Sequence, residues 1–447
     1  MADHEHSLES LIRADLAITP DDWPPFSGPP APVPLSARVN VDALAWASVA
    51  AASMAAASIA QSHTLTLDPA RIAMAYTSDR HLRWNGEPQQ SFAPLSGFFR
   101  TSDGWVRTHG NYPWHADALR RTLGLRDADG ANEAAEAFTR RTSAEVSAAI
   151  TDAGGLCVSV APELPAANTE LNRQSLIHIE QFGPAPRRRL PDPSPAAPLA
   201  GIRVLDLTRV IAGPIATRTL ALLGADVLRV DPPSLPEIPL QHLDTGHGKR
   251  STLLDLRSPT DHGRFTELLD TADVVVLGYR PRGLASLGLD PRTLASRHPG
   301  LVIAQLSAWG DPDRRGFDSL IQAASGIAWV ESVDAAAPGV LPAQALDHSA
   351  GYLLASAVIT LLQRRARTGG TWLASTSLRR IAAHLLAGTR HQSLSPAPPL
   401  DPAPHLQTFD IDGTELLTVA PAVSYRGGPT AFASPRPWGE DSPEWRS

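Results

Sequence analysis

The residues of this chain best suited to covalent chemistry are two carboxylates in its second half. Asp318 follows the motif Arg-Arg-Gly-Phe, and Asp347 stands at the start of an apolar stretch that predicts a helix of about five turns. A carboxylate can attack an activated acyl group and split one transfer into two easier steps. A helix N-terminus favours negative charge, so Asp347 is the stronger candidate. The competing interpretation is structural, because an aspartate before a helix is commonly an N-cap.

A second candidate feature is the segment 244–251, which holds two glycines, His247, Lys249 and Arg250 before a predicted strand. Flexible backbone with two cations suits an anionic ligand such as a phosphate, and a solvated turn fits equally well. The helix start after Gly213 offers free N–H groups that could also hold a phosphate.

Several well-known motifs are missing from the sequence. The first predicted strand is not followed by Gly-x-Gly-x-x-Gly, which counts against an NAD oxidoreductase. The sequence also lacks a P-loop, His-Glu-x-x-His, Cys-x-x-Cys and Gly-x-Ser-x-Gly, so we expect no metal site and no serine-hydrolase elbow.

Composition narrows the class of protein further. The chain has 447 residues, of which 43% are hydrophobic and 19% charged, with a net charge of -7 that predicts no nucleic-acid partner. The single cysteine, Cys157, and an acidic N-terminus without a signal-peptide pattern favour a cytoplasmic location. The Ala-rich run 43–60 is short and weakly apolar, so we expect a buried helix and no membrane partner.

Strands and helices that would position these residues alternate from residue 199 onward. We predict strands over 203–207, 226–230, 252–256, 273–277 and 301–307, with helices over 212–223 and 261–269. This rhythm is typical of an α/β fold with a doubly wound parallel, Rossmann-like sheet, which binds ligands beyond the carboxyl ends of its strands. Segments 208–214, 278–282 and 307–310 would lie on that side.

The remaining chain predicts a second, smaller α+β domain. Residues 98–106 are typical of a β-hairpin that turns at Asp103-Gly104. We divide the chain into an N-terminal arm (1–37), the smaller α+β region (38–182), a Pro/Arg-rich linker (183–198), the Rossmann-like domain (199–390) and a Pro-rich C-terminal segment with short strands (391–447).

Six blocks between residues 198 and 390 resemble, in order, the class III CoA-transferases, the group of formyl-CoA and carnitine-CoA transferases that includes α-methylacyl-CoA racemases. The blocks are 198–214, 223–233, 248–256, 279–281, 315–326 and the stretch around Asp347. The resemblance implies an enzyme that moves CoA from an acyl-CoA to a carboxylic acid. It also implies a homodimer, with CoA thioesters as substrates and no tightly bound cofactor.

The resemblance also implies roles for individual residues. Asp347 would attack the thioester, form a mixed anhydride and then hold CoA as an aspartyl thioester. The expected contacts to CoA come from residues in the matching blocks: Val210, Ile211, Ala212, Lys249, Tyr279 and Arg315.

Other positions depart from the family pattern. The racemase branch has a histidine where this chain has Phe317, and a phenyl ring cannot shuttle a proton. A family side-chain amide is lost at Gly278, and a family arginine falls on Ser286. His348 is expected to face solvent.

The order of parts departs as well, because small-domain material precedes the Rossmann-like part and suggests a rearranged or tandem-derived member. Two alternatives stay open: an acyl-CoA isomerase or racemase on the same scaffold, and a catalytically silent CoA-binding subunit.

Overall fold

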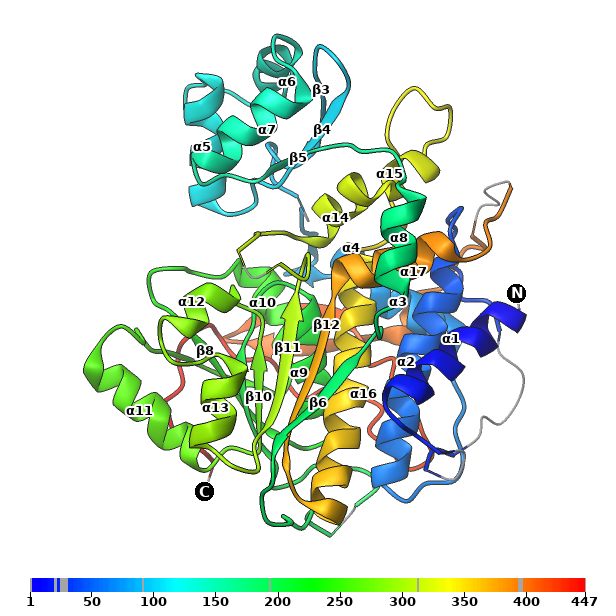
Figure 1. The fold of residues 1–447 in the computed structure, drawn as a ribbon, viewed down its shortest axis with the longest axis vertical. Coiled ribbons are helices and arrows are strands. Elements are labelled where there is room, and N and C mark those ends of the chain that lie inside the picture. The colour runs from blue at the N-terminus through cyan, green and yellow to red at the C-terminus, as the bar shows by residue number, and fades with distance from the viewer. Residues whose placement is uncertain are drawn as a thin grey trace.

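A seven-stranded sheet forms the centre of the computed structural model, which describes residues 2–19, 22–24, 31–90, 92–192, 194–311, 313–392 and 397–446. Its strand order is β6-β12-β11-β10-β7-β8-β9, and all neighbours are parallel except β6, which pairs antiparallel with β12 (Figure 1). The strands are β6 (His178–Gly183), β7 (Arg203–Leu207), β8 (Asp226–Asp231), β9 (Arg250–Leu253), β10 (Val274–Leu277), β11 (Val302–Ser307) and β12 (Thr371–Ser377). The predicted fold class is confirmed, although β9 begins two residues earlier than expected.

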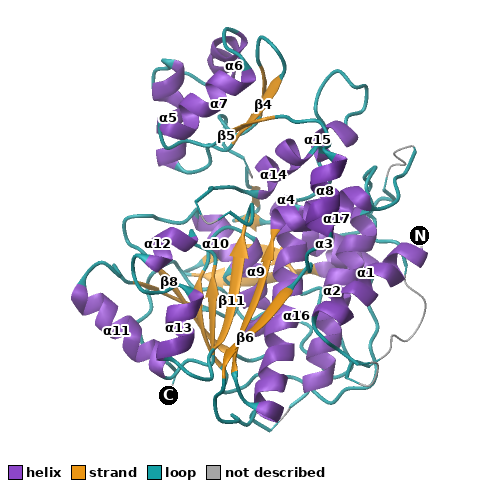
Figure 2. Cartoon of the chain, viewed as in Figure 1, coloured by secondary structure: helices purple, strands orange, loops and turns teal. Residues whose placement is uncertain are grey.

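Alternation along the strands assigns the two faces of the sheet, because successive side chains of a strand point to opposite sides. Val204, Val276 and Ala304 belong to one core, which also contains α9 (Ala212–Leu222), α16 (Ala345–Thr368) and α2 (Val41–Ile59). The opposite core holds Leu205, Val275 and Ile303 together with α11 (Pro259–Asp270), α12 (Pro281–Ala285) and α13 (Pro291–Arg297). Figure 2 shows these helices on both sides of the sheet. Both faces are covered, as a parallel sheet requires.

Two helices, α2 and α16, are long and apolar enough to cross a membrane, judged by length and composition alone. Within the structure, 94% and 100% of those segments are buried, so both behave as core helices. The expected burial of the Ala-rich run is therefore confirmed. Close approach of α16 to α9 depends on Gly351, where an added Cβ would lie 2.6 Å from the Ala212 carbonyl oxygen.

A small α/β unit lies beyond the carboxyl ends of the sheet strands, and the arrowheads of β10 and β11 point toward it in Figure 1. The unit contains β3 (Phe98–Arg100), β4 (Trp105–Thr108), β5 (Cys157–Ser159), α5 (Pro113–Leu123), α6 (Ala131–Thr139) and α7 (Ser143–Asp152). It has its own core, in which Phe99 stacks on Phe138 with ring centroids 4.7 Å apart. The predicted hairpin is confirmed, with β3 and β4 paired antiparallel.

A third sheet has the order β13-β14-β1-β2 and joins distant parts of the chain. It contains β1 (Arg83–Trp84), β2 (Glu87–Pro88), β13 (Leu406–Ile411) and β14 (Thr414–Val419). The other elements are α1 (Ala2–Asp15), α3 (Pro69–Tyr76), α4 (Ser78–His81), α8 (Pro165–Asn172), α10 (Pro239–Thr245), α14 (Asp318–Ser325), α15 (Ile327–Val330), α17 (Leu378–Ala387) and the 3-10 turn η1 (Ala403–His405). The C-terminal segment then returns to the large sheet, where Trp438 Nε1 donates to Asp231 Oδ2 at 2.9 Å.

Packing does not follow the predicted division of 38–182 from 199–390. Helix α2 packs in the same core as α16, and β6 adds an edge strand to the large sheet. Within the predicted region 38–182, the unit from β3 to β5 has a core of its own. The sequence pattern missed this because a helix or strand shows its own periodicity but not the partner against which it packs.

Candidate active site

Three adjoining cavities lie along the carboxyl ends of the parallel strands. We call them the outer cavity (about 700 Å³, around β8, β9 and α12), the arginine cavity (about 450 Å³) and the amide cavity (about 280 Å³). The outer and arginine cavities share Leu235, Arg257, Tyr279 and Arg280. The arginine and amide cavities share Val210, Phe317 and Asp347. Asp347 therefore lies on the partition between the last two.

The local structure of α16 leaves the Asp347 carboxyl available. Asp347 is the third residue of the helix and 6% exposed, and the N-cap is Gln344, whose side chain makes no capping bond. Instead Asp318 Oδ2 accepts the backbone N–H of Asp347 at 3.0 Å. The N-cap interpretation of Asp347 is therefore wrong, because Asp318 supplies the capping carboxylate from α14.

Asp318 is itself held in place by side-chain hydrogen bonds. Gln322 Nε2 donates to Asp318 Oδ1 at 2.6 Å, and Gln322 Oε1 accepts the N–H of Leu341 at 3.0 Å. This chain of bonds joins α14 to the loop before α16. It fixes the start of the helix, and with it the position of Asp347.

Both carboxyl groups have a raised affinity for protons. Burial raises the pKa of Asp347 well above its usual value, and the nearby charge of Asp318 raises it further. Burial is also the main cause of the raised pKa of Asp318. When ionised, Asp347 is thus a more basic oxygen nucleophile than a solvated carboxylate.

The loop after β7 and the start of α9 bring Val210, Ile211 and Ala212 to the cavities beside Asp347. Val210 lines both the arginine and amide cavities, Ala212 the first and Ile211 the second. Val210 has φ +70°, a left-handed conformation that is strained for a β-branched residue. Space is limited at Gly213 too, where an added Cβ would lie 2.3 Å from Thr208 Cβ. Contacts of this loop to CoA stay a prediction.

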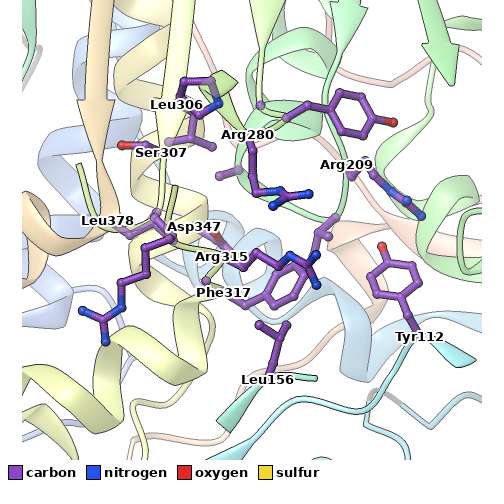
Figure 3. A pocket seen from close by; sticks show the side chains of 18 of the residues that line it. Tyr112, Leu156, Arg209, Arg280, Leu306, Ser307, Arg315, Phe317, Asp347 and Leu378 are labelled. Carbon is purple, nitrogen blue, oxygen red and sulfur yellow. The ribbon is translucent and has the colours of Figure 1, made fainter. Parts of the chain in front are cut away.

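Five arginines line the arginine cavity: Arg209, Arg257, Arg280, Arg314 and Arg315. In Figure 3 the labelled side chains of Arg209, Arg280 and Arg315 reach into this pocket from different loops, with Asp347 and Phe317 nearby. The Arg209 guanidinium lies 4.6 Å from the Tyr112 ring centroid, and Arg315 Nη1 donates to the Gly154 carbonyl at 2.9 Å. The sequence predicted Arg315 but missed Arg209, although Arg209 precedes Val210 at the end of a predicted strand.

Tyr279 lines the wall shared by the outer and arginine cavities, and its contact to CoA stays a prediction. Its hydroxyl donates to Asp231 Oδ1 at 2.9 Å, which holds the ring in position. The two departures from the family pattern reach the same region, since Gly278 lines the arginine cavity and Ser286 the outer cavity.

The structure corrects the prediction for Lys249. The side chain is 3% exposed, and Nζ donates to Thr217 Oγ1 at 2.6 Å, the Pro214 carbonyl at 2.9 Å and Asp206 Oδ2 at 3.0 Å. All three donors of the ammonium group are thereby used inside the protein. Burial lowers the pKa of Lys249 to about 8. Lys249 therefore holds β7 and α9 together and does not reach a cavity that could take CoA.

The rest of the segment 244–251 is structural as well. His247 is fully buried, with Nδ1 2.7 Å from the Asp244 carbonyl oxygen and Nε2 3.0 Å from Thr418 Oγ1. Arg250 pairs with Asp226 at 2.9 Å. The segment 244–251 is therefore neither a phosphate-binding loop nor a solvated turn, the two interpretations that its sequence allowed.

His348 differs from its prediction too. Its side chain is 4% exposed, lines the amide cavity and stacks on Tyr76 with ring centroids 5.0 Å apart. Burial, and after it the charge of Arg218, lowers the pKa of His348 to about 3. The predicted solvent-facing histidine is wrong because this face of α16 packs against α3.

The N-terminal part of the chain supplies residues that sequence reasoning missed. His109, Gln89 and Asn111 line the amide cavity, and Tyr112 lines the arginine cavity. The His109 ring stacks on Phe317 with centroids 4.0 Å apart. Lone polar residues in a region without a catalytic motif carry no signal of this kind, since only the fold brings them to Asp347.

Comparison with known proteins relates part of this site to a known family. The sequence model of CoA-transferase family III matches residues 199–411, which include the loop after β7, the arginines and Asp347. We call these residues the family III segment. The family III segment thus carries all of the outer cavity, whereas the arginine and amide cavities are completed by residues 78–156.

Relatives of the chain include several named CoA-transferases. A probable fatty acyl-CoA transferase of Mycobacterium tuberculosis is 33% identical over 236 residues, covering 48% of this chain and 60% of that protein. A formyl-CoA:oxalate CoA-transferase of Rhodopseudomonas palustris is 32% identical, covering 38% and 44%. A succinate–glutarate CoA-transferase of Agrobacterium fabrum is 29% identical, covering 51% and 64%. The matches therefore span 44 to 64% of the length of these relatives.

Among solved structures, a hypothetical protein from Mycobacterium tuberculosis is 35% identical to this chain over the aligned part. The TM-score is 0.41, over 43% of this chain and 57% of that one. Within the part of the chain described above, no cluster of three or more His, Cys, Asp or Glu side chains could hold a metal ion.

Proposed function

We propose that this protein is a class III CoA-transferase, which moves CoA from an acyl-CoA donor to a carboxylic acid through an aspartyl-CoA thioester on Asp347. The observation that carries the proposal is the place of Asp347 on the partition between two cavities, with its helix capped by Asp318. The relatives' names support CoA transfer and specify different acids, so they leave the acid of this chain open.

CoA would lie along the outer and arginine cavities. These share Arg257 and Arg280, whose guanidinium groups suit phosphate oxygens. The pantetheine arm would run past Val210 and Ala212 toward Asp347. CoA is then a substrate that enters and leaves, and the residues it would meet lie along one continuous path.

The chemistry needs no net proton. The ionised carboxylate of Asp347 attacks the thioester carbonyl, the C–S bond breaks, and CoA thiolate leaves a mixed anhydride. The thiolate then attacks the aspartyl carbonyl, so that the donor acid departs with one oxygen from Asp347. The acceptor carboxylate reverses these steps and returns an oxygen. Burial favours the reaction, because a desolvated carboxylate beside Asp318 is a strong nucleophile.

An acyl-CoA isomerase is the second candidate, and one observation favours it. Phe317 cannot carry a proton, but His109 stacks on it and lines the same cavity as Asp347. Burial lowers the pKa of His109 to about 3, so the ring is neutral and a weak base at neutral pH. Exchange of the substrate's α-hydrogen with deuterated water, measured by NMR, would separate this candidate from a transferase.

Intact-protein mass spectrometry tests the proposal directly. Wild-type protein incubated with an acyl-CoA should gain the mass of CoA less one water, and hydroxylamine should convert the adduct to a hydroxamate on Asp347. The Asp347→Asn variant should gain neither. Asp318→Asn, which keeps an oxygen acceptor for the Asp347 N–H, is the matched control and should still form the adduct. No adduct on folded wild-type protein would indicate the silent CoA-binding subunit.

Location in the cytoplasm and assembly as a homodimer stay predictions. Each cavity that Asp347 lines has walls from both the N-terminal part and the family III segment of one chain. Light scattering coupled to gel filtration tests the dimer.

A further inference from the structure

We propose that the acyl group accepted by this site is uncharged, that of a monocarboxylic acid, and that acyl groups with a second carboxylate are disfavoured. The inference rests on the proposed function and concerns the amide cavity, which lies across Asp347 from the arginines. CoA would fill the arginine side. The acyl chain, and later the acceptor acid, must then extend into the amide cavity.

The polar lining of the amide cavity consists mainly of neutral groups. Five residues with amide side chains line it: Gln89, Gln90, Asn111, Gln241 and Gln344. Leu82, Phe92 and Ile238 add apolar walls. An amide can donate to or accept from a hydroxyl, keto or amide group of a substrate, but it does not neutralise a charge.

The charged groups of this cavity are acidic. Asp79, Asp244 and Asp347 line it, whereas none of the described residues that line it is an arginine or a lysine. The Asp244 carboxyl already accepts the Ser78 hydroxyl at 2.7 Å. A second substrate carboxylate would lose water here without gaining a cation, and it would face like charges.

Two arginines near the amide cavity, Arg218 and Arg107, do not line it and interact with other groups of the protein. Arg218 Nη1 donates to the Asp244 carbonyl at 2.6 Å and lies 3.9 Å from Asp244 Oδ1. Arg107 lies over the rings of Phe92 and Phe98, at 5.3 and 4.9 Å from their centroids. Its charge also acts on Asp318. Neither guanidinium belongs to the cavity lining.

The two histidines of the cavity do not supply a cation either. Burial lowers the pKa of His109 and of His348 to about 3 in each case. Both rings are therefore neutral at physiological pH. The amide cavity therefore has no cationic lining residue among those described, whereas the arginine cavity on the other side of Asp347 has five arginines. This difference in formal charge is the basis of the inference.

Two thioesters with the same number of carbons, hexanoyl-CoA and adipoyl-CoA, test the proposal, because they differ only in the terminal carboxylate. Formation of the aspartyl-CoA adduct would be followed by intact-mass spectrometry under single-turnover conditions. We expect hexanoyl-CoA to react at least about tenfold faster than adipoyl-CoA, since the buried second charge has no partner. Equal rates, or a preference for adipoyl-CoA, would overturn the inference and leave the proposed function standing. If neither thioester forms an adduct, the proposed function itself fails.

A gain of charge provides a second test. Gln241 is partly buried on α10 and lines the amide cavity. Gln241→Arg should raise the ratio of the adipoyl-CoA rate to the hexanoyl-CoA rate, whereas Gln241→Met, of similar length and without charge, should not. An unchanged ratio in a folded Gln241→Arg protein contradicts the inference.

Discussion

The arginine cavity and the amide cavity share a wall at Asp347 and Phe317 but differ in charge. Five arginines line the first, and three aspartates with five side-chain amides line the second. A ligand with phosphates gains partners only in the first, and an uncharged acyl group loses least by entering the second. Under the proposed function, this difference would orient an acyl-CoA across Asp347 before any chemistry begins.

The outer cavity and the amide cavity also differ in origin. The outer cavity, which adjoins the arginine cavity, is lined by family III residues alone, whereas eight of the residues lining the amide cavity lie between Ser78 and Asn111. Binding of CoA in the outer cavity would thus depend only on residues inside the family match. Recognition of the acid would depend in part on residues outside the family match, so the names of relatives carry limited information about it.

Asp347, where the two cavities meet, should show the largest effect. We expect Asp347→Asn to lower the rate of CoA transfer by at least about 10³-fold, because an amide cannot form the anhydride. The measurement is CoA exchange between an acyl-CoA and a labelled acid. Asp318→Asn should lose less of the exchange rate. Full exchange by Asp347→Asn would contradict the proposed role of Asp347.

Lys249 is a cation that lines neither cavity, so its substitution should change stability rather than substrate binding. Lys249→Met should lower the free energy of unfolding by about 3 kcal/mol, because Asp206 is left buried without its ionic partner. Urea denaturation measures this change. The double variant with Asp206→Asn should recover part of the loss. If Lys249→Met keeps its stability but binds CoA poorly, Lys249 contacts CoA after all and its structural role is wrong.

Arg280 tests the arginine side alone. Arg280→Gln should raise the KM for the acyl-CoA about tenfold and leave the KM for the acid nearly unchanged, because one phosphate contact is lost. Arg282 is a matched control, since it is exposed, pairs with Asp313 at 2.8 Å and lines none of the three cavities. An equal effect of Arg282→Gln would show that the positive field, rather than the cavity, binds CoA.

The smallest effect concerns stability and pH. The pKa of Asp347 is raised in the folded protein, so its protonated form favours folding, and this contribution is lost as pH rises through the folded pKa. Asp347→Asn should therefore be more stable than wild type at pH 8 by about 1 kcal/mol, with the gain shrinking toward pH 4. Thermal unfolding across this pH range measures it. A gain that grows as pH falls would contradict the raised pKa.

Local patterns predicted much of the architecture. Alternating strands and helices indicated the parallel sheet, and a strong turn dipeptide indicated the hairpin at Asp103. These features succeed because each depends on residues close in sequence. The buried helix α2 was predicted as well, but its place against α16 was not, because periodicity does not identify a partner.

The sequence by itself determined the family III segment, the sheet and Asp347 as the leading carboxylate, because each depends on spacing within a short stretch or on ordered motifs. Only the tertiary structure decided that Asp318, and not Asp347, caps α16, and that Lys249 turns inward to Asp206. It also brought His109 against Phe317. These contacts join side chains distant in the chain, and their energy depends on burial and on partners that only folding brings together.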